Sequence, residues 1–206
     1  MNERHQRLQA LLLTVVAGTA DAVGFLTMGG IFAANMTGNT VLAGIAVAQG
    51  HWLDAWRHLA PLIAFFAGAM ISRLLLRLLR APTASLIVEA ALLAVVGFLP
   101  VGPEVAVLIV AASMGVQASA ITHFAGSAVS TVVVTSTLSR AADAALDRLW
   151  PGDDRAPLGV TNRRLLALAW IGYLIGAVIG ALLVPILPYP LLVPAALLLV
   201  VLFIRA

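Results

Sequence analysis

The sequence contains no cysteine and no lysine, and only 10% of its residues are charged. Without cysteine the chain can form no disulfide, no thiolate metal site and no cysteine nucleophile. The HExxH, GxSxG and P-loop motifs and a paired-carboxylate motif are also absent. We therefore expect no enzymatic activity, no resident cofactor and no metal site.

Apolar residues make up 62% of the 206 residues, against about 45–50% in soluble domains. All twelve basic residues are arginine, and they cluster at the ends of apolar runs, which indicates membrane topology rather than nucleic-acid binding. A bilayer-spanning helix needs roughly 20 apolar residues. The sequence therefore predicts an all-α polytopic membrane protein, a single transmembrane domain over residues 1–206. Its apolar segments cover roughly 8–28, 31–50, 59–79, 84–100, 104–122, 126–146, 164–185 and 188–204.

The N-terminus resembles a signal peptide, because Arg4 and Arg7 precede the apolar stretch Leu8–Val16. The apolar run resumes after Asp21, however, and further long runs follow. We therefore expect an uncleaved first transmembrane helix.

The arginines favour six crossing helices over eight. If segments 31–50 and 126–146 dip into the membrane and return on the same side, eleven of the twelve arginines lie in the cytoplasm, and only Arg57 lies outside. With eight crossings, nine of the twelve arginines lie in the cytoplasm, and Arg73, Arg77 and Arg80 lie outside. The six-crossing model predicts cytoplasmic N- and C-termini and a cytoplasmic loop over about 140–164. The eight-span alternative stays open.

The two dipping segments are also the most polar. Irregular backbone at membrane depth survives only where protein or a water-filled cavity satisfies its polar groups. We expect both segments to be broken or re-entrant; the alternative is an ordinary polar helix in a bundle. Their amide and hydroxyl residues are Asn35, Thr37, Asn39 and Thr40 in the first and Ser127, Ser130, Thr131, Thr135, Ser136, Thr137 and Ser139 in the second.

Three matches indicate an internal repeat, about 8–100 and 104–204. Gly18–Ala22 resembles Met114–Ala118, which sets Asp21 against Gln117, and Thr37–Asn39 resembles Thr135–Thr137. The third match is between the small residues of the third and seventh segments. The six-crossing topology makes the halves inverted 3+3 repeats, a plan that carriers and channels share. Small residues at every fourth position let helices approach closely, within the chain or in a dimer. These predicted packing residues are Ala64, Gly68 and Ser72 in the third segment and Gly172, Gly176 and Gly180 in the seventh.

Asp21 lies roughly 20 Å into the first helix at about 1.5 Å per residue. An unpaired charge there costs at least about 2.5 kcal/mol, so Asp21 is a candidate to bind a proton or cation; the alternative is a structural cap. Asn35, Thr37 and Asn39 either contact a solute or cap a half-helix over Thr37–Gln49. Their predicted symmetric partners are Gln117, Thr135 and Thr137.

The run Asp21–Leu26, with Ala34–Asn39 after it, resembles the signature of the YoaK-type bacterial inner-membrane proteins, a family of unknown function. The Ala-Asn-Met-Thr-Gly-Asn run is the most specific part. The resemblance covers essentially the whole chain and implies a bacterial inner-membrane location and transport. It implies no particular substrate.

These observations predict a secondary transporter of a small polar solute or ion, with Asp21 as the candidate for proton coupling. Two alternatives stay open: a passive channel of the same architecture, and a non-transporting membrane scaffold or accessory subunit. Because the chain is short for a complete carrier, we expect a homodimer in the lipid bilayer and no nucleic-acid partner.

Overall fold

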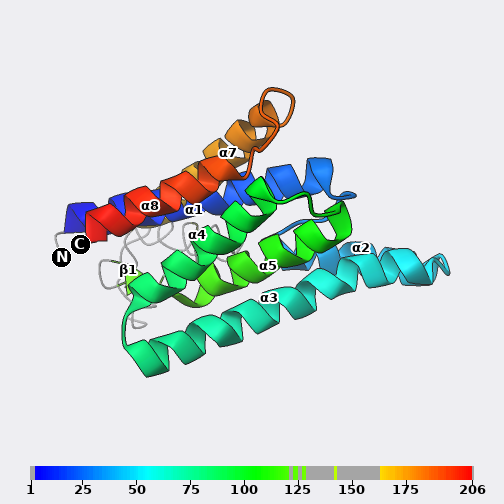
Figure 1. Cartoon of the computed structure of the whole chain (residues 1–206), viewed down its shortest axis with the longest axis horizontal. Helices are drawn as coiled ribbons and strands as arrows, with labels where there is room; N and C mark the ends of the chain where they lie inside the picture. Colours follow the sequence, from blue (N-terminus) through cyan, green and yellow to red (C-terminus); the bar gives the residue numbers. More distant parts are fainter. Residues whose placement is uncertain (1–2, 121–122, 125–126, 129–141, 143–162, 206) are drawn as a thin grey trace.

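The computed structural model describes residues 3–120, 123–124, 127–128, 142 and 163–205 (Figure 1). Four of its helices are long and apolar enough to cross a membrane: α1, α3, α5 and α7. This confirms the prediction of an all-α polytopic membrane protein. The elements are α1 (Glu3–Thr27), α2 (Met36–Ala48), α3 (Trp52–Leu79), α4 (Pro82–Phe98), α5 (Pro103–Ala120), β1 (His123–Phe124), β2 (Ser127–Ala128), α7 (Arg163–Leu183) and α8 (Leu192–Arg205).

The second apolar segment is re-entrant within the bundle. After α1 the chain turns back over residues 28–35, and the 13-residue helix α2 then begins part-way along the bundle. In Figure 1 α2 runs out toward the end at which α1 finishes, and α3 returns along the whole length. The segment therefore enters and leaves at one end, as predicted for residues 31–50.

The sixth apolar segment lies almost entirely outside the described residues. Its described start, Ser127–Ala128, pairs antiparallel with His123–Phe124 as a two-residue strand rather than opening a helix. The predicted site residues Thr135 and Thr137, and the predicted loop over 140–164, lie outside the described residues.

The long helices pack in two parallel pairs. α1 packs along α7, and α3 packs along α5, while the shorter α4 and α8 pack on α5 and α1 and against each other. Along the chain, α1 and α5 run in opposite directions, and so do α3 and α7 (Figure 1).

Glycines bring α1 and α7 into backbone contact. A Cβ on Gly18 would overlap the carbonyl oxygen of Tyr173, and a Cβ on Gly176 would overlap the carbonyl oxygen of Val15. Only glycine fits where two helix backbones come this close.

Glycines also bring α3 and α5 into backbone contact. A Cβ on Gly115 would overlap the carbonyl oxygen of Phe65, and a Cβ on Gly68 would overlap that of Ala112. In both crossings, each helix contributes one glycine and one carbonyl about a turn away.

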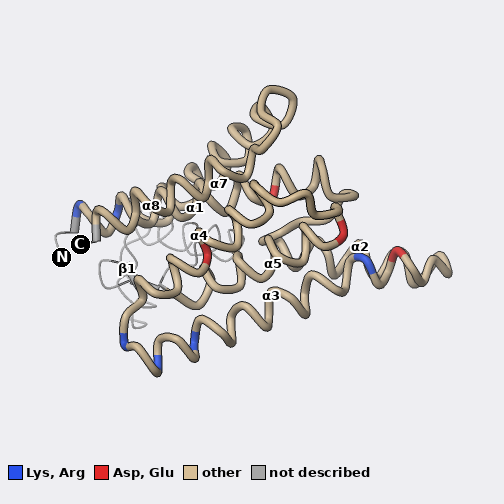
Figure 2. The backbone as a smooth tube through the Cα atoms, viewed as in Figure 1, with Lys and Arg blue, Asp and Glu red and all other residues tan. Residues whose placement is uncertain are grey.

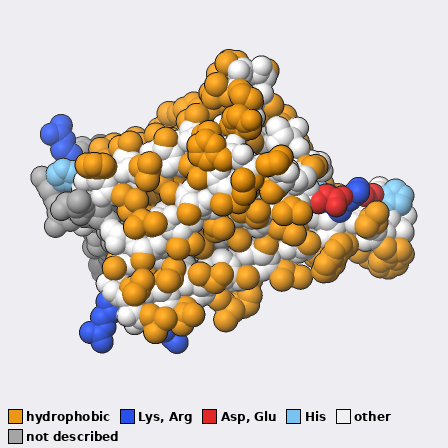
Figure 3. All heavy atoms as spheres, in the orientation of Figure 1, with side chains coloured by type: hydrophobic (Ala, Val, Ile, Leu, Met, Phe, Trp, Pro, Cys, Tyr) orange, Lys and Arg blue, Asp and Glu red, His pale blue; other side chains and the backbone are white. Residues whose placement is uncertain are grey.

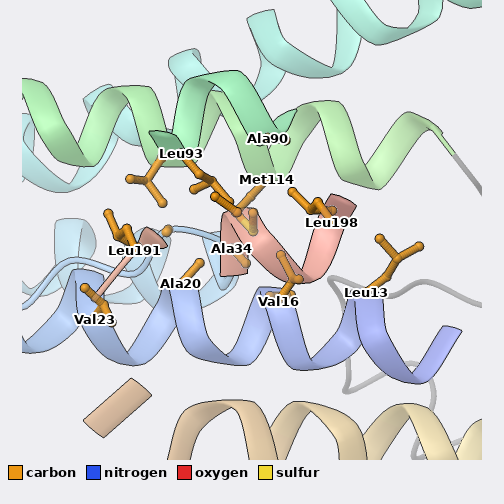
Figure 4. Packing of buried hydrophobic residues seen from close by; sticks show 14 of the residues in the cluster. Leu13, Val16, Ala20, Val23, Ala34, Ala90, Leu93, Met114, Leu191 and Leu198 are labelled. Atoms are coloured by element: carbon orange, nitrogen blue, oxygen red, sulfur yellow. The ribbon is translucent and has the colours of Figure 1, made fainter. Parts of the chain in front are cut away.

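The core lies where α1, α4, α5 and α8 meet. Figure 4 shows Val16 and Ala20 of α1 directed toward Met114 of α5, with Ala90 of α4 and Leu198 of α8 beside them. In lipid, apolar burial adds little driving force, so close packing of these side chains is what holds the helices together.

The outer surface is apolar, and the charges lie at the ends. Phe66, Met70, Leu74 and Leu78 on α3 are exposed, and Figure 3 shows hydrophobic side chains over the length of the bundle. Figure 2 shows basic residues at the end that holds both termini and the α3–α4 turn; at the opposite end basic and acidic residues lie together. This distribution suits a protein whose sides face acyl chains.

Candidate functional site

The site is built on the irregular loop 28–35, between α1 and α2. Gly29 and Gly30 have φ values of 78° and 74°, which reverse the chain after α1. Ala33 and Ala34 are buried against the bundle, and the ring of Phe32 stacks on Phe25 with centroids 4.8 Å apart. Non-helical backbone buried at this depth must find its hydrogen-bond partners inside the protein.

The carboxylate of Asp21 supplies several of those partners. Its Oδ1 accepts hydrogen bonds from the N–H groups of Ala34, at 2.5 Å, and Asn35, at 3.2 Å. Its Oδ2 accepts from the hydroxyl of Tyr173 on α7. Asp21 is 3% exposed, so this one side chain joins α1, the start of α2 and α7 inside the bundle.

Two opposing influences act on this carboxylate. Burial disfavours its ionised form, whereas three hydrogen-bond donors favour it. Because Ala34 and Asn35 directly precede α2, the positive end of that helix dipole also favours negative charge. The arrangement can therefore hold a carboxylate whose protonation would weaken three hydrogen bonds at once.

Asn35 is the N-cap of α2. Its Oδ1 accepts from the N–H of Gly38 at 3.2 Å and from the hydroxyl of Thr37 at 2.8 Å. A capping amide satisfies one of the four N–H groups that a helix start leaves free. Thr37 itself is exposed.

Asn39 closes the loop from inside α2. Its Nδ2 donates to the carbonyl of Phe32 at 2.7 Å, and its Oδ1 accepts from the N–H of Phe32 at 3.0 Å. Asn39 is completely buried, so these two bonds replace water for both backbone groups of Phe32.

The structure thus brings Asp21, Asn35, Thr37 and Asn39 together around one loop. The hydrogen bonds of Asp21, Asn35 and Asn39 to backbone groups are the arrangement that the capping alternative describes. Contact of these residues with a solute stays a prediction.

Gln117 does not join this cluster. It is 1% exposed, and its Nε2 donates at 2.9 Å to the carbonyl of Leu13 on α1. Leu13 precedes Asp21 by eight residues, about 12 Å along a helix. Gln117 therefore stabilises the contact between α1 and α5 at a different level from the loop.

The backbone contacts also set a different register from the sequence match. By these contacts Gly18 of the first crossing corresponds to Gly115 of the second, 97 positions later, whereas the sequence match aligned Gly18 with Met114. Ala118, not Gln117, consequently takes the place of Asp21 in the second crossing. The carbonyl of Phe65 meets Gly115 as the carbonyl of Tyr173 meets Gly18. Phe65 of α3, 108 positions before Tyr173, therefore stands in the second crossing where the first has the tyrosine hydroxyl.

The predicted packing residues lie at helix contacts. A Cβ on Gly172 would overlap Oγ1 of Thr14, and one on Gly180 would lie 2.8 Å from the carbonyl oxygen of Thr19. The hydroxyl of Ser72 donates to Ser85 on α4 at 3.0 Å. Ala64 is half-buried on α3.

Tyr173 is the site residue that sequence reasoning missed. A signal was present: the chain has only two tyrosines, and this one lies in an apolar helix between Gly172 and Gly176. A buried tyrosine hydroxyl usually has a hydrogen-bond partner, so its position indicates a polar group nearby.

The described residues contain no group of three or more potential metal ligands.

A model of the family described as "Protein of unknown function (DUF1275)" matches residues 9–204. The chain belongs to this family. It is 32% identical over 187 residues to UPF0700 transmembrane protein YoaK of Bacillus subtilis, covering 84% of this chain and 82% of that one. It is 29% identical over 178 residues to UPF0700 transmembrane protein RA0705 of Rhizobium meliloti, covering 84% and 73%. No solved structure matches. Membership of the DUF1275 family and the relatives' names agree with the predicted YoaK-type resemblance and with a membrane location.

Proposed function

We propose that this protein is a secondary transporter of a small polar solute or ion across the bacterial inner membrane, and that Asp21 couples protonation to the position of α2. One observation carries the proposal: a single buried carboxylate ties the start of a re-entrant helix to two long helices. Ionisable groups inside a membrane bundle are expensive and usually mark a path for ions or solutes.

In the proposed cycle the ionised carboxylate holds the loop closed. Hydrogen bonds to an ionised acceptor are roughly twice as strong as neutral ones. Protonation of Asp21 weakens its bonds to Ala34, Asn35 and Tyr173 together. The start of α2 is then held by Asn39 and by packing on α3, so it can move away from α1 and α7.

The frame supports an inverted-repeat transporter plan. The α1–α7 and α3–α5 crossings use matching glycine–carbonyl contacts, and the helices of one crossing run opposite to those of the other. The expected second half-helix, with Thr135 and Thr137, lies outside the described residues and stays a prediction.

Orientation and assembly are part of the proposal. The basic end of the bundle carries both termini, which supports cytoplasmic termini under the positive-inside rule. A homodimer is expected on account of the chain's small size. Cysteine accessibility at positions 57 and 80 tests the orientation, because the natural chain has no cysteine; labelling of position 80 from outside would favour eight spans.

The test is flux in proteoliposomes loaded with a pH-sensitive dye, under an imposed pH gradient. Sodium, potassium, chloride and inorganic phosphate serve as the first solutes. We expect a saturable, solute-dependent proton flux that Asp21→Asn abolishes. The matched control is Asp54→Asn, because Asp54 is exposed at the end of the bundle and pairs with Arg57 at 3.3 Å.

Each outcome separates the candidate functions. Flux that rises linearly with solute and ignores the pH gradient would favour a channel. Absence of flux with every solute would favour the scaffold alternative. Flux of Asp21→Asn equal to that of the control would exclude Asp21 as the coupling group.

A further inference from the structure

A second buried carboxyl group lies in α4. Glu89 is completely buried, and among the described residues neither of its carboxyl oxygens has a hydrogen-bond partner. Its neighbours in sequence, Leu86, Ala90 and Leu93, belong to the apolar core that Figure 4 shows. Glu89 therefore differs from Asp21, which accepts three hydrogen bonds.

The helices packed on α4 bring no described opposite charge to Glu89. These helices are α5, α8 and α3. On α4 the bond between Ser72 and Ser85 lies one helical turn before Glu89. The ionisable residues of the three helices are Glu104 on α5, Arg205 at the end of α8, and Asp54, Arg57, His58, Arg73 and Arg77 on α3.

Three of those ionisable residues pair with one another, and the others have no described bond to Glu89. Arg57 pairs with Asp54 and with Glu104, each at 3.3 Å. Arg73 and Arg77 are exposed, His58 lies in the second turn of α3, and Arg205 is at the last position of α8. None forms a described ion pair with Glu89.

We propose that Glu89 is a proton-binding site, carrying a proton in this conformation and releasing it only when α4 separates from its neighbours. An ionised carboxylate without donors in a low-dielectric interior is far more costly than the neutral acid. Two carboxyl groups in contrasting surroundings are also how proteins divide proton-donating and proton-accepting roles. That this proton is used in transport rests on the proposed function; its presence rests on the burial of Glu89 alone.

Infrared spectroscopy of the reconstituted full chain tests the proposal. The chain has only three glutamates, Glu3, Glu89 and Glu104. Carboxyl-¹³C glutamate labelling therefore marks three groups. At pH 8 an ordinary glutamate is ionised, because its pKa is about 4.3. We expect one isotope-shifted C=O band of a protonated acid at pH 8.

Variants assign the band. It should persist in Glu3→Gln and Glu104→Gln and vanish in Glu89→Gln. If Glu89→Gln fails to fold, the double variant of Glu3 and Glu104 still assigns the band, since only Glu89 remains. A spectrum of that double variant without the band overturns the proposal, as does a band that survives in Glu89→Gln.

Flux measured on the same samples separates the two proposals. A band from Glu89 without flux means that the proposed function fails while the proton site stands. Flux without the band means that transport stands and the assignment of Glu89 fails.

Discussion

The α1–α7 crossing and the α3–α5 crossing are built from the same backbone contacts, but among the described residues only the first holds a polar cluster. Gly18 and Gly176 in one correspond to Gly115 and Gly68 in the other. Where the first has Asp21 and Tyr173, the second has Ala118 and Phe65.

The difference shows that helix crossing and polar chemistry are separable in this fold. Small residues are enough to bring two helices into backbone contact, and they do so twice. Among the described residues, such a carboxylate and hydroxyl occur only in the crossing beside loop 28–35, where the carboxylate bonds the loop backbone and the hydroxyl bonds the carboxylate. The first crossing therefore has both a packing role and a polar role, and substitutions at its glycine and at its tyrosine separate them.

The largest effect is expected from Gly68→Ala and Gly176→Ala, one in each crossing. Each new Cβ would overlap a backbone carbonyl oxygen, which cannot swing aside as a side chain can. Overpacking of this kind costs about 1–3 kcal/mol, and more when backbone must shift. Thermal unfolding in detergent should show a clear loss of stability for both variants.

Gly44→Ala on α2 is the matched control, because nothing lies within 4 Å of its added Cβ. It should keep or slightly raise the stability. If Gly68→Ala and Gly176→Ala unfold at the wild-type temperature, the two crossings are looser than described.

A smaller effect is expected from Tyr173→Phe, which gives the first crossing the residue of the second. Asp21 then loses one of its three donors. A hydrogen bond to a charged group contributes about 1.5–3 kcal/mol. The free energy of unfolding should fall by about that amount, and protease cleavage in loop 28–35 should become faster.

Phe65→Tyr is the converse control. It adds a hydroxyl opposite Ala118, the residue that stands where the first crossing has the carboxylate of Asp21. It should leave cleavage of loop 28–35 unchanged. Equal cleavage rates for Tyr173→Phe and the wild type would mean that the hydroxyl does not hold the loop.

The smallest effect is expected from Ser72→Ala, which breaks the bond between α3 and α4. A neutral hydrogen bond contributes about 0.5–1.5 kcal/mol. Since both hydroxyls are buried, the double variant Ser72→Ala/Ser85→Ala should lose less than the sum of the single losses. Unfolding of the four proteins of this cycle measures the coupling, and strict additivity would contradict the bond.

Several features could be predicted because their causes are local. The apolar runs mark the membrane helices, and the spacing from Asn35 to Asn39 marks a capped helix start. The hydrogen bonds of Asn35 and Asn39 span three and seven residues, so short-range rules describe them. The bond from Tyr173 to Asp21 spans 152 residues, and no local rule connects the two.

The alignment of one crossing with the other likewise could not be predicted from local sequence rules. Sequence similarity set Asp21 against Gln117, whereas the glycine contacts set it against Ala118. A shift of one residue rotates a helix position by about 100°, so it decides which side chains face a site. Similarity among small residues is too weak to resolve one position, and backbone contact resolves it.

By itself, the sequence determined that this is a membrane protein, where most of its described helices lie, and that residues 31–50 break and re-enter, because hydropathy, capping and turn residues act over a few positions. Only the tertiary structure decided that the carboxylate of Asp21 joins three elements, that Gln117 lies elsewhere, and that Glu89 has no described partner. Those facts depend on which helix faces meet, and close packing between distant segments determines that.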